Sequence, residues 1–175
     1  GSVSASVVSH ASCPVVVVRE DNHVTDSTKY GPVVVGVDGS EVSQKATAYA
    51  FREAQARGAA LIAVHTWMDM QVQASLAGLS AAQSEWADIE KEQSELLTEN
   101  LKEPREEYPE VEVKKLITRD RPVSALTEAA EGAQLLVVGS HGRGGFKGML
   151  LGSTSRALLQ SAPCPMMVVR PDEES

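Results

Sequence analysis

Four short runs of apolar residues, rich in valine and other β-branched or aliphatic types, recur along the chain, together with a fifth strand-like stretch, VEVKKLIT at 111–118, that also contains charged residues. Continuous apolar runs of this length are typical of strands that are buried on both faces of a sheet. Between them, apolar residues at helical spacing predict helices that begin at Ser40 and Pro122 and end near Gly58 and Gly132. The expected strands cover residues 33–38, 60–66, 111–118, 135–139 and 166–170.

A longer amphipathic helix is expected between the second and third strands, with Leu97 and Leu101 on its apolar side and Pro104 and Pro109 marking its end. The acidic residues between 85 and 110 indicate that its other face is solvated. Strands that alternate with helices imply an α/β fold with a parallel sheet and helices on both faces. In such sheets ligands bind outside the carboxyl ends of the strands, where the strand order reverses.

The chain contains an internal repeat. Residues 1–19 match residues 152–170 at a shift of 151 positions without a gap, and nine of nineteen positions are identical. Each copy has Gly-Ser, a short helix, Cys-Pro and a valine-rich strand. We therefore expect the start of the chain to be the last helix and strand of a preceding copy of the same domain. The expected organisation is this remnant at 1–19, a linker at 20–31, a complete domain at 32–171 and a tail at 172–175.

The strand expected within residues 15–19 would expose an unpaired, valine-rich edge. Such an edge promotes aggregation, so we expect it to be covered by the last strand, residues 166–170. The pairing partner is either the last strand of the same chain or that of a second chain in a homodimer, and edge-strand physics does not choose between them.

The bulk properties exclude several classes of partner. A formal net charge of −8 argues against a general nucleic-acid or anionic-membrane surface. No apolar run reaches the roughly 18 residues of a membrane span, and the N-terminus lacks the features of a signal peptide. Cys13 and Cys164 do not form a disulfide framework, so we expect a reduced, cytoplasmic protein.

Residues 139–148 form a loop with five glycines, and a helix is expected directly after it, at Gly152 and Ser153. Glycines let backbone N–H groups approach a ligand closely, and a helix N-terminus offers unpaired N–H groups. Arg143 and Lys147 add positive charge, so the loop predicts an anion site, with a flexible connection and an ordinary serine cap as the alternative. It is neither a P-loop nor a dinucleotide fingerprint, because Lys147 stands in the place of the third glycine.

Three stretches of the chain resemble the universal stress protein family: VVVGVDGS at 33–40, VVGSHGRGG at 137–145 and GSTSRALLQSAPCPMMVV at 152–169. The nucleotide-binding branch of that family carries Gly, two residues, Gly, nine residues and then Gly-Ser or Gly-Thr. The same spacing is present here at Gly139, Gly142, Gly152 and Ser153. Many bacterial members contain two such domains in tandem, which agrees with the internal repeat.

The resemblance implies a Rossmann-like parallel sheet of five strands in the order 3-2-1-4-5, with ATP or ADP in the crevice and Mg²⁺ as a candidate bridge between phosphates. It assigns to Asp38 a hydrogen bond with the ribose. The alternative interpretation of Asp38 is that its carboxylate caps the following helix. It places Gly36, Thr66 and Val138 near the adenine. It places around the phosphates Gly139, His141, Gly142, Gly152, Ser153 and Thr154. The positive charge of Arg143 is our own addition to this phosphate site.

Several functions stay open. The favoured one is a nucleotide-binding regulatory module in a stress response. The others are a slow ATPase or an autokinase that modifies Ser153 or Thr154, a cyclic-AMP binder, and a dimerising scaffold without a required ligand. Binding is favoured over turnover because phosphoryl transfer needs a positioned base, and Asp38 is already assigned to the ribose. No catalytic residue and no protein metal ligand is predicted.

Overall fold

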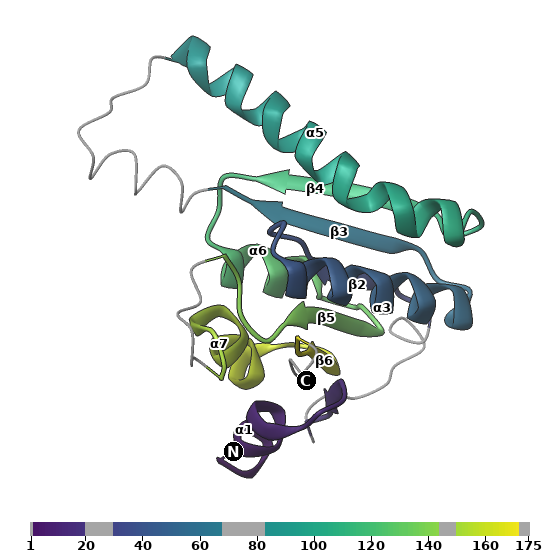
Figure 1. Cartoon of the computed structure of the whole chain (residues 1–175), viewed down its shortest axis with the longest axis vertical. Helices are drawn as coiled ribbons and strands as arrows, with labels where there is room; N and C mark the ends of the chain where they lie inside the picture. The colour runs from purple at the N-terminus through teal and green to yellow at the C-terminus, as the bar shows by residue number, and fades with distance from the viewer. Residues whose placement is uncertain (1, 20–29, 68–82, 144–149, 172–175) are drawn as a thin grey trace.

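The computed structural model describes residues 2–19, 30–67, 83–143 and 150–171. These residues form a six-stranded sheet in the order β1-β6-β5-β2-β3-β4 (Figure 1). The strands are β1 (Val15–Val17), β2 (Val33–Gly36), β3 (Leu61–Thr66), β4 (Val113–Thr118), β5 (Leu135–Gly139) and β6 (Met166–Val169). The helices are α1 (Ser2–His10), α3 (Glu41–Arg57), α5 (Gln83–Glu107), α6 (Pro122–Ala129) and α7 (Ser153–Ser161).

The sheet is parallel from β4 to β6, and β1 runs antiparallel to β6 at one edge. The expected number of five strands is therefore wrong, because β1 adds a sixth strand. Without β1 the order is β4-β3-β2-β5-β6, which corresponds to the third, second, first, fourth and fifth strands of the expected domain. The sequence left open whether this strand pairs within one chain or between two chains. In the structure β1 pairs with β6 of the same chain, and this pairing covers an edge of β6.

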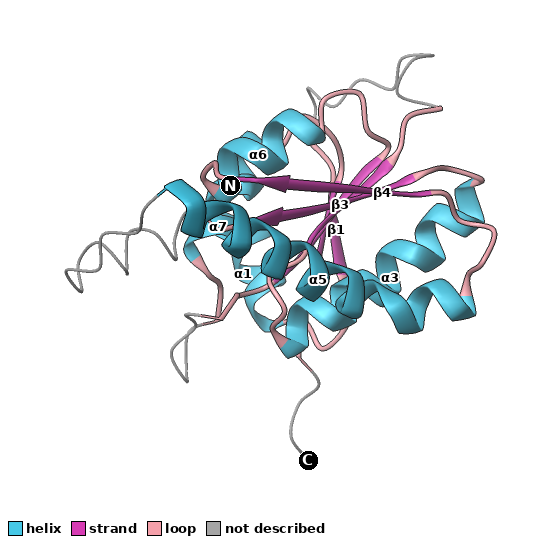
Figure 2. Ribbon diagram, turned by 90° about the horizontal axis from the view of Figure 1, so that it is seen from above, coloured by secondary structure: helices cyan, strands magenta, loops and turns pink. Residues whose placement is uncertain are grey.

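Both faces of the sheet carry a hydrophobic core. Along β2, Val33 and Val35 pack into the cluster that contains Phe51 of α3, while Val34 packs into the cluster that contains Leu126 of α6. This alternation follows from the two-residue period of a strand. Figure 2 shows α3 and α6 on opposite sides of the strands, so the expectation of helices on both faces is confirmed.

The two ends of α3 agree with the sequence. Ser40 is the N-cap, and its side chain accepts a hydrogen bond from the backbone N–H of Ser43. Gly58 ends the helix with φ +60°, a left-handed conformation that glycine adopts without strain. Its N–H bonds the carbonyls of Ala54 and Gln55.

The long helix ends between the two prolines that were expected to mark its end. α5 continues to Glu107, so Pro104 lies inside the helix and Pro109 follows it. A proline within a helix removes one hydrogen bond, here the bond to the carbonyl of Asn100, and near the last turn this loss is small. Beyond Pro104 the helical pattern resumes, because Tyr108 N donates to Pro104 O at 2.9 Å.

Among the residues that the structure describes, none of the helices combines the length and the apolar composition of a membrane-spanning segment.

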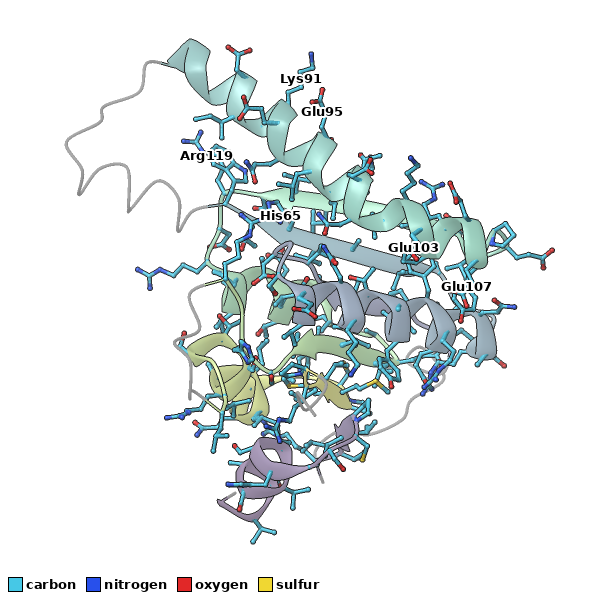
Figure 3. All side chains as sticks on the ribbon, viewed as in Figure 1. His65, Lys91, Glu95, Glu103, Glu107 and Arg119 are labelled. Carbon is cyan, nitrogen blue, oxygen red and sulfur yellow. The ribbon has the colours of Figure 1, made fainter. Side chains whose placement is uncertain are left out.

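His65 joins the sheet to α5. It lies on β3 beneath that helix (Figure 3) and is only 2% exposed. Its Nδ1 donates to the carbonyl of Val37 at 2.7 Å, and its Nε2 lies 2.9 Å from Oε1 of Gln93 on α5. When the ring is neutral, Nε2 accepts, and Gln93 then presents its amide NH₂ group instead. His65 therefore has a structural role in this fold.

The two cysteines differ in environment, and this predicts two rates of thiol labelling. Cys13 is exposed, whereas Cys164 is buried, and burial raises the pKa of the Cys164 thiol to about 11. At pH 8 only about a thousandth of such a thiol is the reactive thiolate. We expect a maleimide to label Cys13 quickly and Cys164 slowly under native conditions, as followed by mass spectrometry. Equal native rates would contradict the burial of Cys164.

Candidate functional site

The site begins where the strand order reverses. β2 and β5 are neighbours, although the chain between them visits β3 and β4. Their carboxyl ends lead into the turn at Asp38 and the loop that starts at Gly139. The first residues of α7 return to the same place, because Gly152 N donates to Ser140 O at 2.7 Å. The structure therefore brings three sequence-distant segments together at the edge where open α/β sheets bind ligands.

Asp38 connects two of these segments. Its Oδ1 accepts hydrogen bonds from Ser40 N at 2.9 Å and from Ser40 Oγ at 2.6 Å. Its Oδ2 accepts from Arg143 N at 3.1 Å. Asp38 therefore does not cap α3 itself: it holds Ser40, which is the N-cap, and it also holds the loop. Since a carboxylate has about four acceptor positions, about one remains on Oδ2.

The glycines of the motif allow close packing between the segments. A Cβ at Gly142 would lie 2.3 Å from Oδ2 of Asp38, and one at Gly139 would lie 3.0 Å from Cγ1 of Val42. A Cβ at Gly152 would lie 3.1 Å from Cα of His141. The sequence assigned these glycines to the approach of a ligand. In the structure they are already required by contacts of the protein with itself.

The N-terminus of α7 has no side-chain cap. Gly152 is the N-cap residue, and Ser153 is exposed. The hydroxyl of Ser155 donates to Gly139 O at 2.6 Å, so it ties the helix to the end of β5 instead of capping the helix. The first N–H groups of a helix need partners, and together with the helix dipole they favour an anion.

The residues expected near an adenine lie on the same edge. Gly36 ends β2, and a Cβ there would lie 3.3 Å from Cδ1 of Leu126 and 3.6 Å from Cγ1 of Val138. Val138 is buried on β5, beside Gly36. Thr66 ends β3, on the next strand of the sheet, and pairs with Thr118 of β4.

The remaining expected residues lie around the loop. His141 is half-buried, and its Nδ1 lies 3.0 Å from Oγ of Ser140. Arg143 is exposed, and its guanidinium lies beside Gly39, with Nη2 2.8 Å from the position of a Cβ there. Thr154 is half-buried in the first turn of α7. Lys147 lies outside the described residues.

Three buried serines belong to the site and were not found from the sequence. Ser43 accepts a hydrogen bond from Asp38 N, Ser140 O accepts one from Gly152 N, and Ser155 holds the end of β5. Their common signal is a small hydroxyl residue beside a strand-to-helix connection, where backbone groups need partners. That signal is too frequent in loops to have singled them out.

An acidic groove lies next to this site, between α3 and α5. Its α5 side carries four glutamates at intervals of four residues, which places them along one face of the helix. They are Glu95, Glu99, Glu103 and Glu107, and three of them are labelled in Figure 3. The groove shares Gly39 and Arg143 with the site. Because its wall is anionic, the groove does not suit a phosphate chain. All four glutamates are exposed, so the expectation of a solvated acidic face on this helix is confirmed.

Within the described ranges there is no cluster of three or more histidine, cysteine, aspartate or glutamate side chains that could hold a metal ion.

Comparison with known proteins defines the class of this protein. The family model described as "Universal stress protein family" matches residues 29–170. The chain belongs to the universal stress protein family. Universal stress protein Rv2005c of Mycobacterium tuberculosis is 47% identical over 170 residues, which are 97% of this chain and 56% of that protein. The chain thus spans just over half the length of the curated relatives that it matches.

Two solved structures extend the comparison. A universal stress protein in complex with cAMP is 27% identical, with a TM-score of 0.55, over 80% of this chain and 96% of that one. A universal stress protein from Archaeoglobus fulgidus shares the fold with 22% identity and a TM-score of 0.62. That match covers 99% of this chain and 55% of the Archaeoglobus chain.

Proposed function

We propose that this chain binds an adenine nucleotide, ATP or ADP, in the crevice between the ends of β2 and β5, and that it acts as a nucleotide-dependent regulatory module in a stress response. The observation that carries the proposal is the N-terminus of α7. It has no side-chain cap and meets the loop of residues 139–143 at the point where the strand order reverses. The match to the glycine spacing of the family supports the same site.

The residues present fit such a ligand. The phosphates are expected at the first N–H groups of α7, with the hydroxyls of Ser153 and Thr154 as further donors. The remaining acceptor position of Asp38 suits a ribose hydroxyl, which donates. The adenine is expected against Gly36, Val138 and Thr66, at the carboxyl ends of β2, β5 and β3.

Mg²⁺ has a limited place in this proposal. Since the described residues hold no carboxylate cluster for it, the ion would arrive with the nucleotide, held by phosphate oxygens and water. The hydroxyls of Ser153 and Thr154 are neutral oxygen groups that such an ion can also coordinate.

Cyclic AMP is the second candidate ligand, and the solved relative in complex with cAMP favours it. The adenine and ribose contacts would be shared, whereas a cyclic phosphate brings one negative charge to α7 instead of several. Calorimetric titration of the purified chain with ATP, ADP and cyclic AMP separates the candidates. Mass spectrometry of any nucleotide released on denaturation shows which one the protein carries from cells.

Ser153→Asp tests the position of the phosphates. A carboxylate in the first turn of α7 stabilises the helix by about 0.3–1 kcal/mol, so the fold is expected to persist. At about 5 Å from a phosphate charge it costs about 1–3 kcal/mol, which weakens ATP binding by a factor of about 5 to 150. Binding of cyclic AMP is expected to weaken less, because it carries a single charge.

Ser124→Asp is the matched control. Ser124 is an exposed first-turn residue of α6, so the substitution adds the same charge to the N-terminus of a different helix. We expect its ATP affinity to stay within about twofold of the unmodified chain. Equal affinities in both aspartate variants and the unmodified chain would show that the phosphates do not lie at α7.

A further inference from the structure

Arg143 belongs to two parts of the molecule at once. Its backbone N–H lies in the site, where it donates to Oδ2 of Asp38 at 3.1 Å. Its guanidinium packs against the turn at Gly39, with Nη2 2.8 Å and Cζ 3.5 Å from the position that a Cβ would occupy there. Gly39 and Arg143 both line the acidic groove between α3 and α5. The backbone of Arg143 is therefore fixed at the site, while its charge lies at the groove.

The groove and α7 lie over opposite faces of the sheet. The core on one face includes Phe51 of α3 and Leu97 of α5. The core on the other face includes Leu126 of α6 and Leu158 of α7. The guanidinium of Arg143 is thus on the side of α3 and α5, whereas the phosphates are proposed at the helix that covers the other side.

Two contacts show how α3 and α5 lie against each other. Near the start of α3, Gln44 Nε2 donates to Asn100 Oδ1 at 3.4 Å. Further along α3, the ring of Phe51 stacks on that of Tyr108, directly after α5, with centroids 6.2 Å apart. Moving forward along one helix therefore means moving forward along the other, and the two helices run in the same direction.

This direction identifies the glutamates nearest to the guanidinium. Gly39 comes before the start of α3, so it lies opposite the part of α5 that precedes Asn100. Glu95 and Glu99 occupy that part, and both are exposed and line the groove. Glu103 comes after Asn100, towards the far end of the groove (Figure 3).

The row of glutamates favours a cation in this place. Like charges four residues apart on a helix repel each other, so a positive charge beside Glu95 and Glu99 lowers the energy of the row. Among the described side chains, Arg143 forms no ion pair with a glutamate within 4.0 Å. The attraction therefore acts over a longer distance through solvent, and a stronger anion can overcome it.

We infer that Arg143 regulates the affinity of the nucleotide site by moving between these two anionic surroundings. Without nucleotide, Glu95 and Glu99 keep its guanidinium on the side of α3 and α5. The phosphates of a bound nucleotide attract it towards α7, and the bond from Arg143 N to Asp38 keeps the loop in place while the side chain moves. The acidic row thereby lowers the affinity for ATP. The inference rests on the proposed function, because the nucleotide is the competing anion.

The side chain starts close to both places. Cα of His141 lies 3.1 Å from the position of a Cβ at Gly152, the N-cap residue of α7. Arg143 is the second residue after His141. A rotation of its side chain, without refolding of the loop, therefore brings the charge from the groove towards the start of α7.

The first measurement needs no nucleotide. In the ¹⁵N-labelled chain, the Nε–H resonance of Arg143, identified by its loss in Arg143→Met, reports the surroundings of the guanidinium. We expect Glu95→Gln together with Glu99→Gln to shift this resonance by more than its line width. Glu103→Gln together with Glu106→Gln is the matched control. It removes the same charge from two exposed positions further along α5 and should leave the resonance in place.

The second measurement is the ATP affinity of the same proteins by calorimetry. Glu95→Gln together with Glu99→Gln should bind ATP about threefold to tenfold more tightly than the unmodified chain, because Arg143 is then free to reach the phosphates. In the Arg143→Met background the same pair should change the affinity by less than about twofold, which is the direct effect of two distant charges. The control pair should stay within about twofold in both backgrounds.

The outcomes separate this inference from the proposed function. A resonance of Arg143 that does not respond to Glu95→Gln with Glu99→Gln would overturn the inference, whatever nucleotide binds. An equal gain in affinity with and without Arg143 would also overturn it, since the glutamates would then act on the phosphates directly. A shifted resonance in a chain that binds no nucleotide would refute the proposed function and the competition, and would leave only the place of the guanidinium at the groove.

Discussion

Replacing Gly142 with alanine is expected to disrupt the site and to lower the free energy of unfolding by about 1–3 kcal/mol. The new Cβ would lie 2.3 Å from Oδ2 of Asp38, a distance that no real contact tolerates. Either the carboxylate or the loop must move. Both movements break the hydrogen bond from Arg143 N to Asp38, which holds the loop to the turn after β2. Under the proposed function, ATP binding is lost with it.

Urea unfolding measures the stability of this variant, and calorimetry measures its nucleotide affinity. Gly58→Ala is the control, because Gly58 has φ +60° and alanine there costs about 1 kcal/mol through backbone strain alone. Gly58 ends α3, which begins at the site, so the strain lies at the opposite end of that helix. A Gly142→Ala protein that binds ATP as tightly as Gly58→Ala would refute the role of the close contact with Asp38.

His65→Leu is expected to cost about 2–4 kcal/mol, the second large effect. Leucine preserves much of the side-chain volume but cannot donate to the carbonyl of Val37 or bond with Gln93. Both partners are in the interior, where an unsatisfied polar group costs about 1–3 kcal/mol. Because Val37 directly precedes Asp38, the variant is also expected to loosen the turn at the site.

A double-mutant cycle distinguishes the hydrogen bond from simple packing. Gln93 is 5% exposed, and in His65→Leu its side chain is left buried without its histidine partner. Gln93→Leu removes this unsatisfied polar group. The double variant should be more stable than the sum of the single effects predicts, by about 1 kcal/mol or more in urea unfolding. Strictly additive effects would show that the two side chains do not interact energetically.

The sequence by itself determined the elements of this protein. The apolar runs predict strands, of which β2, β5 and β6 are buried, whereas the charged stretch forms the more exposed strand β4. Ser40 and Gly58 mark the two ends of α3, and the repeat of residues 1–19 is visible without coordinates. These features depend on residues within one element or on a residue-by-residue comparison of two stretches of the sequence. Propensity, periodicity and capping act over a few residues, so they leave a local trace that can be recognised.

Only the tertiary structure decided how the elements meet. It placed β1 in the same sheet as β6, extended α5 past Pro104, and showed that Gly142 of the glycine motif already packs against Asp38. The bond between Asp38 and Arg143 joins residues that are 105 positions apart. Such a contact depends on how the intervening strands are ordered, and the residues at its two ends carry no local signal of it, because the energy of a contact depends on its partner.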